Sequence, residues 1–213
     1  MKRYLRSFWV LGFLCLFNSA AFAADKLPYE KITPPQPVAE KGKLEVVEVF
    51  WYTCPHCYTL DPALEAWAKN LPDDVVLVKL PAIFSNNHWA ALAQVYYVAE
   101  ELNVLDTMHE KIFASIHKEK RPLRTMEDFA KLFKEHAGIS KEDFTKALNS
   151  FSVDAKVRNA KRLTQKYGIN AVPSLVVNGE YRMTSSMTGG YDQLLQEADK
   201  LLDAARQKQV SAK

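Results

Sequence analysis

The sequence predicts an α/β fold that is interrupted by an inserted all-helical domain. Two apolar, β-branched stretches at 44–52 and 75–80 flank a helical pattern, which makes a strand-helix-strand unit. From about residue 85 onward the apolar residues recur at helical spacing only, and strand patterns return after residue 170. We therefore expect one domain built from residues 24–84 and 151–213, with a helical domain inserted at 85–150.

Each element of the first unit has a signal of its own. The stretches LEVVEVFWY at 44–52 and VVLVKL at 75–80 are rich in β-branched residues and favour buried strands. Pro55 suits the first position of a helix, because its missing N–H would have no partner there. The helix is expected to continue to about Asn70, with Pro62 inside it.

Capping signals divide the insertion into helices. Thr125 and Ser140 each stand three residues before an aspartate, which is typical of an N-cap, and Gly138 is typical of a helix end. The apolar and aromatic residues between these signals are expected to form a core.

Strand patterns return in the last part of the chain. A helix expected over about 153–167 is followed by Asn178 and Gly179 between two β-type runs, which predicts a hairpin with a primed turn. The last helix is expected over about 192–205, where leucines and alanines fall on one face.

The first 23 residues have the pattern of a secretory signal peptide. Basic residues at 2, 3 and 6 precede an apolar run over 8–17, and the small residues Ala21 and Ala23 suit a cleavage site. The run is about half of the roughly 20 residues that a membrane span needs. We expect residues 1–23, and Cys15 with them, to be removed on export.

The charge balance after this removal argues against a nucleic-acid partner. The full chain has 28 basic and 25 acidic residues, and the predicted signal holds three of the basic ones and none of the acidic ones. The mature chain is therefore near neutral, and no basic surface for nucleic acid or anionic membranes is expected.

The stretch FWYTCPHCYTLDP at 50–62 holds the two cysteines of the mature chain, Cys54 and Cys57. A structural disulfide across so short a loop would restrain little chain entropy. Zinc would need two more ligands, and covalent haem would need a histidine where Tyr58 stands. A redox-active dithiol, with no metal and no bound cofactor, is therefore the prediction.

The position of Cys54 at a helix entrance predicts the direction of its chemistry. Unpaired N–H groups and the partial positive charge of the helix N-terminus stabilise a thiolate, and His56 adds a donor or a positive charge nearby. A stabilised thiolate favours the reduced form, so the corresponding disulfide is readily passed on to other thiols.

CPHC after a buried strand, a helical insertion, and VPSLVVNG before a terminal hairpin and helix together resemble the DsbA family of periplasmic thiol-disulfide oxidoreductases. The resemblance covers essentially the whole mature chain and implies a thioredoxin fold with an inserted all-helical domain. It implies that a Cys54–Cys57 disulfide is donated to reduced, unfolded, newly exported proteins in a Gram-negative periplasm. It also implies reoxidation by a DsbB-like, quinone-linked membrane oxidase.

The same resemblance implies roles for single residues. Cys54 would be the exposed sulfur that is attacked, and Cys57 its buried partner, with Pro55 and His56 as the dipeptide between them. Val172 and Pro173 resemble a cis-proline loop that lies against the disulfide and binds substrate peptide. An ordinary trans proline in a loop is the alternative.

A charged pair interrupts the two predicted strands. Glu48 and Lys79 resemble the buried acid and its lysine partner that ferry protons in this family, and a solvated pair at the edge of the sheet is the alternative. Asp61 is given no role. The insertion's histidines are expected to be surface or hydrogen-bonded core residues: His88, His109, His117 and His136.

Two other functions remain open from the sequence. A disulfide isomerase or reductase of the same fold carries a dimerisation domain, whereas only about 20 residues are expected between the signal and the first central strand, so we expect a monomer. A non-catalytic peptide binder could use the same groove, and it would keep binding peptides when Cys54 is replaced by serine.

Overall fold

The structure is a computed structural model that describes residues 27–84 and 87–211. The predicted signal peptide, with Cys15, lies outside the described residues. Over the part of the chain that is described, no helix combines the length and the apolar character needed to cross a bilayer.

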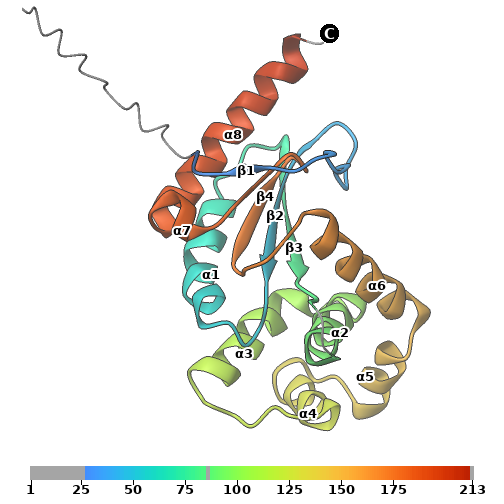
Figure 1. The fold of residues 1–213 in the computed structure, drawn as a ribbon. Helices are drawn as coiled ribbons and strands as arrows, with labels where there is room; N and C mark the ends of the chain where they lie inside the picture. Colours follow the sequence, from blue (N-terminus) through green and yellow to red (C-terminus); the bar gives the residue numbers. More distant parts are fainter. Residues whose placement is uncertain (1–26, 85–86, 212–213) are drawn as a thin grey trace, which may run out of the picture.

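A mixed sheet in the order β1-β5-β4-β2-β3 forms the centre of the described chain (Figure 1). The central strand β2 (Leu44–Phe50) pairs in parallel with β3 (Val75–Pro81) and antiparallel with β4 (Ser174–Val177). Antiparallel pairing continues through β5 (Tyr181–Met183) to the two-residue β1 (Glu30–Lys31). The parallel β2–β3 pair confirms the predicted strand-helix-strand unit.

Helices cover both faces of this sheet (Figure 1). On one face lie α1 (Pro55–Ala68) and α8 (Tyr191–Ser211), with the short α7 (Ser185–Thr188) packed on α8. On the other lie α2 (Asn87–Glu101) and α6 (Phe151–Lys166). The fold is therefore a thioredoxin fold with a helical insertion, as expected.

The insertion continues with α3 (Leu105–His117), α4 (Met126–Ala137) and α5 (Lys141–Leu148). Thr125 and Ser140 are the N-caps of α4 and α5, and each accepts a hydrogen bond from the backbone N–H three residues on. The predicted caps are thus confirmed. Helix α6 packs against α2 and α5 of the insertion, so these contacts do not mark a boundary between residues 150 and 151. The predicted domain boundary there stays a prediction.

Gly138 ends α4 in the left-handed conformation, with φ of 69°. A residue in this conformation closes a helix by satisfying its last carbonyls, and the Gly138 N–H is bonded to the carbonyls of Lys134 and Phe133. The predicted helix end is therefore confirmed.

Alternation along β2 decides which of its residues face α1. Successive side chains of a strand point to opposite faces. Val46 packs in the cluster that includes α1 and α8, whereas Val47 and Val49 pack in the cluster that includes α2 and α6. Glu48 follows the parity of Val46 and so faces α1.

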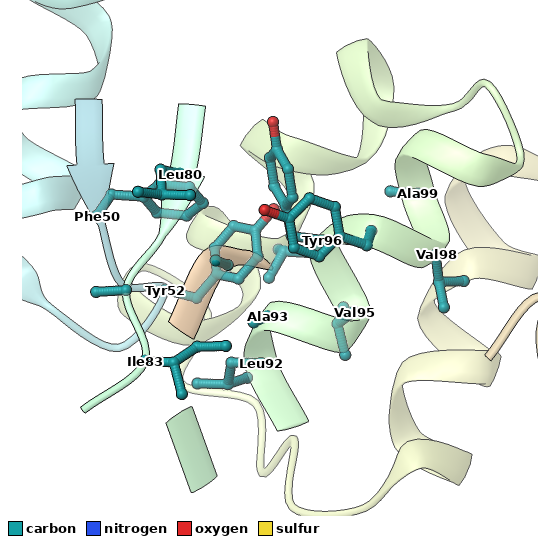
Figure 2. Close-up of a cluster of buried hydrophobic side chains, with 14 of the residues drawn as sticks. Phe50, Tyr52, Leu80, Ile83, Leu92, Ala93, Val95, Tyr96, Val98 and Ala99 are labelled. Carbon is teal, nitrogen blue, oxygen red and sulfur yellow. The ribbon is translucent and has the colours of Figure 1, made fainter. Parts of the chain in front are cut away.

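Aromatic side chains join the end of the sheet to the insertion. Figure 2 shows Phe50, Tyr52 and Leu80 gathered with Leu92 and Tyr96 of α2. The predicted core character of the helical stripes is confirmed by these further buried residues: Met108, Ile112, Phe129, Leu132 and Phe133.

Some boundaries differ from the predictions. The strand β2 ends at Phe50, two residues early, because the chain turns there into the active-site loop. The strand β3 was expected to be buried, but its residues 76–79 are only partly buried, because β3 lies at the edge of the sheet. Helix α8 extends to Ser211, and α7 was not predicted.

The predicted hairpin turn is confirmed by its backbone angles. Asn178 and Gly179 have φ of 50° and 64°, which is the primed-turn conformation. The Gln36 amide donates to the Gly179 carbonyl over 2.9 Å, so the proline-rich segment at 34–37 lies against the turn. A Cβ at position 179 would overlap the Gln36 carbonyl oxygen.

We expect Gly179→Ala to lower the free energy of unfolding by about 2 to 4 kcal/mol, because it adds this overlap to the cost of a left-handed alanine. Gly138→Ala is the matched control, since φ is similar there and nothing lies within 4 Å of its Cβ position. It should cost about 1 kcal/mol. Urea unfolding of both variants measures the difference, and equal losses would contradict the overlap.

Candidate active site

Cys54 is the N-cap of α1, at the point where the chain leaves β2. Its own amide donates to the Trp51 carbonyl over 2.9 Å, which closes the turn. Pro55 occupies the predicted first helical position. The Cys57 N–H then donates to Cys54 Sγ over 3.4 Å, so the sulfur occupies the place of a capping oxygen.

The two sulfurs are unbridged and have different environments. Cys54 is only 8% exposed, so the expectation of an exposed sulfur is wrong, whereas Cys57 is fully buried as expected. A hydrogen bond from the Cys57 thiol lowers the pKa of Cys54 to about 6; partial burial opposes this shift, and the backbone N–H groups of Cys57 and His56 add to it. Burial raises the pKa of Cys57 far above its usual range. At neutral pH one sulfur is mainly a thiolate and the other a thiol.

The Val172–Pro173 loop lies directly against the active sulfur. The peptide bond is cis, so the trans alternative is wrong. Cys54 Sγ lies 3.5 Å from the Val172 carbonyl oxygen and donates to it when the sulfur is protonated. A cleft of about 490 Å³ beside this contact is lined by His56, both loop residues and part of 184–191. An extended peptide could therefore lie next to Cys54.

His56 is exposed at the mouth of this cleft. Its Nδ1 lies 3.0 Å from the hydroxyl of Tyr191, the first residue of α8, and its charge contributes to the lowered pKa of Cys54. The sequence analysis missed Tyr191, because its position beside the active-site helix depends on how α8 packs.

Glu48 and Lys79 are neighbours in register on β2 and β3, on the face that α1 covers. Lys79 Nζ donates to Glu48 Oε2 over 3.3 Å, and the carboxylate is fully buried, which makes the solvated-pair alternative wrong. Burial raises the pKa of Glu48 even though the Lys79 charge opposes this shift. The charge of Glu48 in turn contributes to the raised pKa of Cys57.

Asp61 and His109 complete the cluster, although the sequence analysis gave neither a site role. Asp61 Oδ1 lies 2.8 Å from Lys79 Nζ and 3.1 Å from His109 Nε2. Burial of Asp61 is outweighed by the hydrogen bond from His109 and the charge of Lys79, which lower its pKa to about 2. Asp61 stands four residues after Cys57, one helical turn along the same face, and this spacing was a usable signal.

Metal binding is one chemistry to test against this cluster. Ligand atoms of Glu48, Asp61 and His109 lie within 4.8 Å of one another. Lys79 Nζ lies within 3.3 Å of an atom from each of the three residues, so the cluster already contains a cation. A metal ion would have to displace the lysine, and a metal-free site stays our prediction.

Comparison with known proteins agrees with this geometry. The family described as a DSBA-like thioredoxin domain matches residues 45–201. The thiol:disulfide interchange protein DsbA of Pseudomonas aeruginosa is 38% identical over 200 residues, covering 92% of this chain and 94% of the relative. The DsbA of Bordetella pertussis is 38% identical over 185 residues, covering 85% of each chain.

Solved structures show the same likeness in three dimensions. The crystal structure of Pseudomonas aeruginosa DsbA superimposes with a TM-score of 0.80 at 38% identity, covering 85% of this chain and 94% of that one. The oxidoreductase NmDsbA1 of Neisseria meningitidis gives a TM-score of 0.74 at 25% identity, covering 86% and 94%.

A thioredoxin fold that carries a CxxC pair at the start of its first long helix defines a thiol-disulfide oxidoreductase. The chain belongs to the DsbA family of thiol:disulfide interchange proteins, and it is a protein disulfide oxidoreductase.

We expect the absorbance of the Cys54 thiolate at 240 nm to titrate with a midpoint at about pH 6 in the reduced protein. Cys57→Ala removes the thiol that donates to Cys54, so the midpoint should rise by about one unit or more. The control is Ser152→Ala, in the first turn of α6, whose hydroxyl bonds to Glu101 and not to the active site, and which should leave the titration unchanged. A midpoint near 8.5 in the wild-type protein would contradict the proposed stabilisation of the thiolate.

Acidification should remove the thiolate contribution to stability from the reduced form only, because the oxidised form has no Cys54 thiolate. The folded pKa of Cys54 is about 6, below the unfolded value near 8.5, so its contribution is complete above pH 8.5 and is lost as the pH falls through 6. At pH 7 it is on the order of 1 kcal/mol once solvent screening is allowed for. Thermal melts of both redox forms at pH 8 and pH 4 measure the effect, and a parallel fall in both melting temperatures would contradict it.

Proposed function

We propose that this oxidoreductase works as an oxidant, which donates a Cys54–Cys57 disulfide to reduced, unfolded proteins newly exported to the periplasm. The observation that carries the proposal is the position of Cys54 Sγ at the N-terminus of α1, where it accepts the Cys57 N–H and where its pKa is lowered to about 6. A stable thiolate makes the dithiol the favoured form, so the disulfide tends to oxidise other thiols.

The reaction proceeds in two exchanges. A substrate thiolate attacks Cys54 Sγ, the S–S bond breaks, and the electron pair passes to Cys57 Sγ, which takes up one proton because its pKa is raised. A second substrate thiolate then attacks the substrate sulfur of the mixed disulfide. Cys54 leaves as a thiolate, and the substrate departs with a disulfide.

The loop and the CPHC dipeptide position these steps. Val172 and Pro173 lie beside the cleft next to Cys54, where their backbone can bind an extended substrate peptide. His56 helps to lower the pKa of Cys54. Pro55 fills the first helical position without an N–H of its own, so the sulfur accepts the next N–H groups of the helix.

Glu48 and Lys79 modulate the exchange. Glu48 is a buried carboxyl whose charge is felt at Cys57, so it suits the transfer of a proton to the leaving sulfur. Lys79 balances its charge. Replacing either residue would slow the exchange without abolishing it.

The proposal includes a cellular setting. The relatives named DsbA come from Gram-negative bacteria such as Pseudomonas aeruginosa and Bordetella pertussis, and the signal-like N-terminal sequence supports export to a periplasm. A DsbB-like, quinone-linked membrane oxidase would restore the disulfide. We propose a monomer that needs no metal, no bound cofactor and no nucleic acid.

Cys54→Ser is expected to abolish oxidation of a reduced peptide, because no sulfur remains to receive the attack. Cys57→Ser should instead accumulate mixed disulfides between Cys54 and a peptide with a single cysteine, because such a peptide has no second thiol and Cys57 is no longer there to attack Cys54 Sγ and release the peptide. Mass spectrometry distinguishes these states after each variant is mixed with an oxidant such as oxidised glutathione and a reduced peptide, which has two cysteines to report oxidation and one cysteine to report trapping.

The same experiment separates the oxidant from a passive peptide binder. A binder would retain its affinity for peptides in Cys54→Ser and would produce no peptide disulfide in the wild-type protein. If both serine variants oxidise the peptide at the wild-type rate, the dithiol mechanism is wrong.

A further inference from the structure

Lys79 has more hydrogen-bond acceptors around it than it has protons. Its Nζ lies 3.3 Å from Glu48 Oε2, 2.8 Å from Asp61 Oδ1, 2.8 Å from Glu65 Oε1 and 3.1 Å from His109 Nε2. An ammonium group has three N–H donors. At any moment one of these four acceptors therefore has no proton from Lys79.

The protonation of the His109 ring determines which acceptor receives no hydrogen bond from Lys79. Its Nε2 is 3.1 Å from both Asp61 Oδ1 and Lys79 Nζ, and its Nδ1 is 3.0 Å from the Tyr52 hydroxyl. One nitrogen cannot donate to Asp61 and accept from Lys79 with the same pair of electrons. The ring therefore has two arrangements.

In the first arrangement the proton is on Nε2. His109 then donates to Asp61 and accepts from the Tyr52 hydroxyl at Nδ1, so the three protons of Lys79 are free for the three carboxylates. In the second arrangement the proton is on Nδ1, which donates a hydrogen bond to the Tyr52 hydroxyl, while Nε2 accepts a hydrogen bond from Lys79. One carboxylate then loses its donor.

Glu48 is the carboxylate that loses its hydrogen bond from Lys79 in the second arrangement. Its distance to Lys79 is the longest of the three, and it is fully buried, whereas Glu65 is partly solvated. Its second oxygen, Oε1, is buried and has no hydrogen-bond partner within the described chain. Without the Lys79 proton, the Glu48 carboxylate is left buried without a donor, and its protonated form is favoured.

We propose that His109 is a positioning residue that controls, through Lys79, whether Glu48 holds a proton, and thereby controls proton supply to Cys57. The inference rests on the proposed function, in which breaking the Cys54–Cys57 bond leaves one proton to be added at Cys57. Glu48 supplies that proton and regains one from solvent.

A cleft provides the route to solvent. It measures about 690 Å³, lies between α1 and α3, and is lined by Asp61, Lys79 and His109, whereas Glu48 is not exposed. The titratable and charged groups that face the cluster or line this cleft come from β2 and the turn after it, α1 and its C-cap, β3, α2, and α3 and its C-cap: Glu48, Tyr52, Tyr58, Asp61, Glu65, Lys69, Lys79, Tyr96, Asp106, Glu110 and Lys118.

The test is the variant His109→Gln, whose amide N–H can donate to Asp61 as Nε2–H does and which has no second tautomer; a flipped amide would place its oxygen against the Asp61 carboxylate. Lys79 then stays on Glu48 and favours the carboxylate. We measure the single-turnover oxidation of a reduced peptide by the oxidised protein from pH 4 to pH 9. The limb that depends on Glu48 should move to lower pH by about one unit relative to the wild-type protein.

Three controls make the result specific. Glu48→Gln should remove this limb, and the double variant with His109→Gln should match Glu48→Gln alone, because His109 acts through Glu48. His136→Gln, on α4 and away from the cluster, should match the wild-type protein. The inference is overturned if the His109→Gln profile superimposes on the wild-type profile, or if the double variant shows a further shift.

Folding and function are checked separately. Near-UV circular dichroism reports whether His109→Gln folds, and if it does not, ring ¹⁵N shifts of His109 are compared in the wild-type protein and Glu48→Gln. An unchanged tautomer ratio there would overturn the inference. Wild-type protein that fails to oxidise the peptide would instead contradict the proposed function, whereas an active wild-type protein with an unshifted His109→Gln profile contradicts the inference alone.

Discussion

The hydrogen bond from the Cys57 amide to Cys54 Sγ ties the fold to the chemistry. It forms because β2 delivers the chain to a turn, and because Pro55 begins α1 with no N–H of its own. A helix N-terminus always has N–H groups without partners inside the helix, and here a sulfur takes the place of a capping oxygen. The element that stabilises the helix therefore also stabilises the thiolate.

One helical turn separates two sulfurs with opposite acidities. Cys54 meets donors at the helix entrance, while Cys57 is fully buried and the charge of Glu48 helps to raise its pKa. This difference gives the exchange a direction, because the charge released by bond breakage is stable on one sulfur and is neutralised on the other. In the mechanism proposed above, Glu48 supplies the proton that neutralises Cys57, so the buried acid cluster belongs to the same proposed mechanism.

Local signals in the sequence were enough for much of the fold. Thr125, Ser140 and Asn178 act through hydrogen bonds or backbone angles within a few residues of themselves, and all three were predicted. The same holds for Cys54 and Pro55, whose roles at the helix start depend on α1 alone. The cis state of Pro173 came only from the family resemblance, since a sequence does not show the isomer.

Contacts between distant elements were harder to foresee. Asp61 could have been placed one turn below Cys57 by helical spacing, but its partner His109 lies 48 residues further on, in a helix of the insertion. Nothing near His109 in the sequence indicates that α3 packs against α1. The edge position of β3 was missed for the same reason, because strand order depends on how the returning β4 pairs with β2.

The position of Lys79 on β3 has a consequence apart from acid-base chemistry. An edge strand offers unpaired backbone groups to any extended chain nearby, and a protein whose proposed substrates are unfolded meets such chains constantly. A charged side chain that points inward from an edge strand discourages the addition of another strand, and Pro81 at the end of β3 has no N–H to offer. Lys79, which pairs with Glu48, thus also helps to prevent unfolded substrate chains from adding to the edge of the sheet as an extra strand.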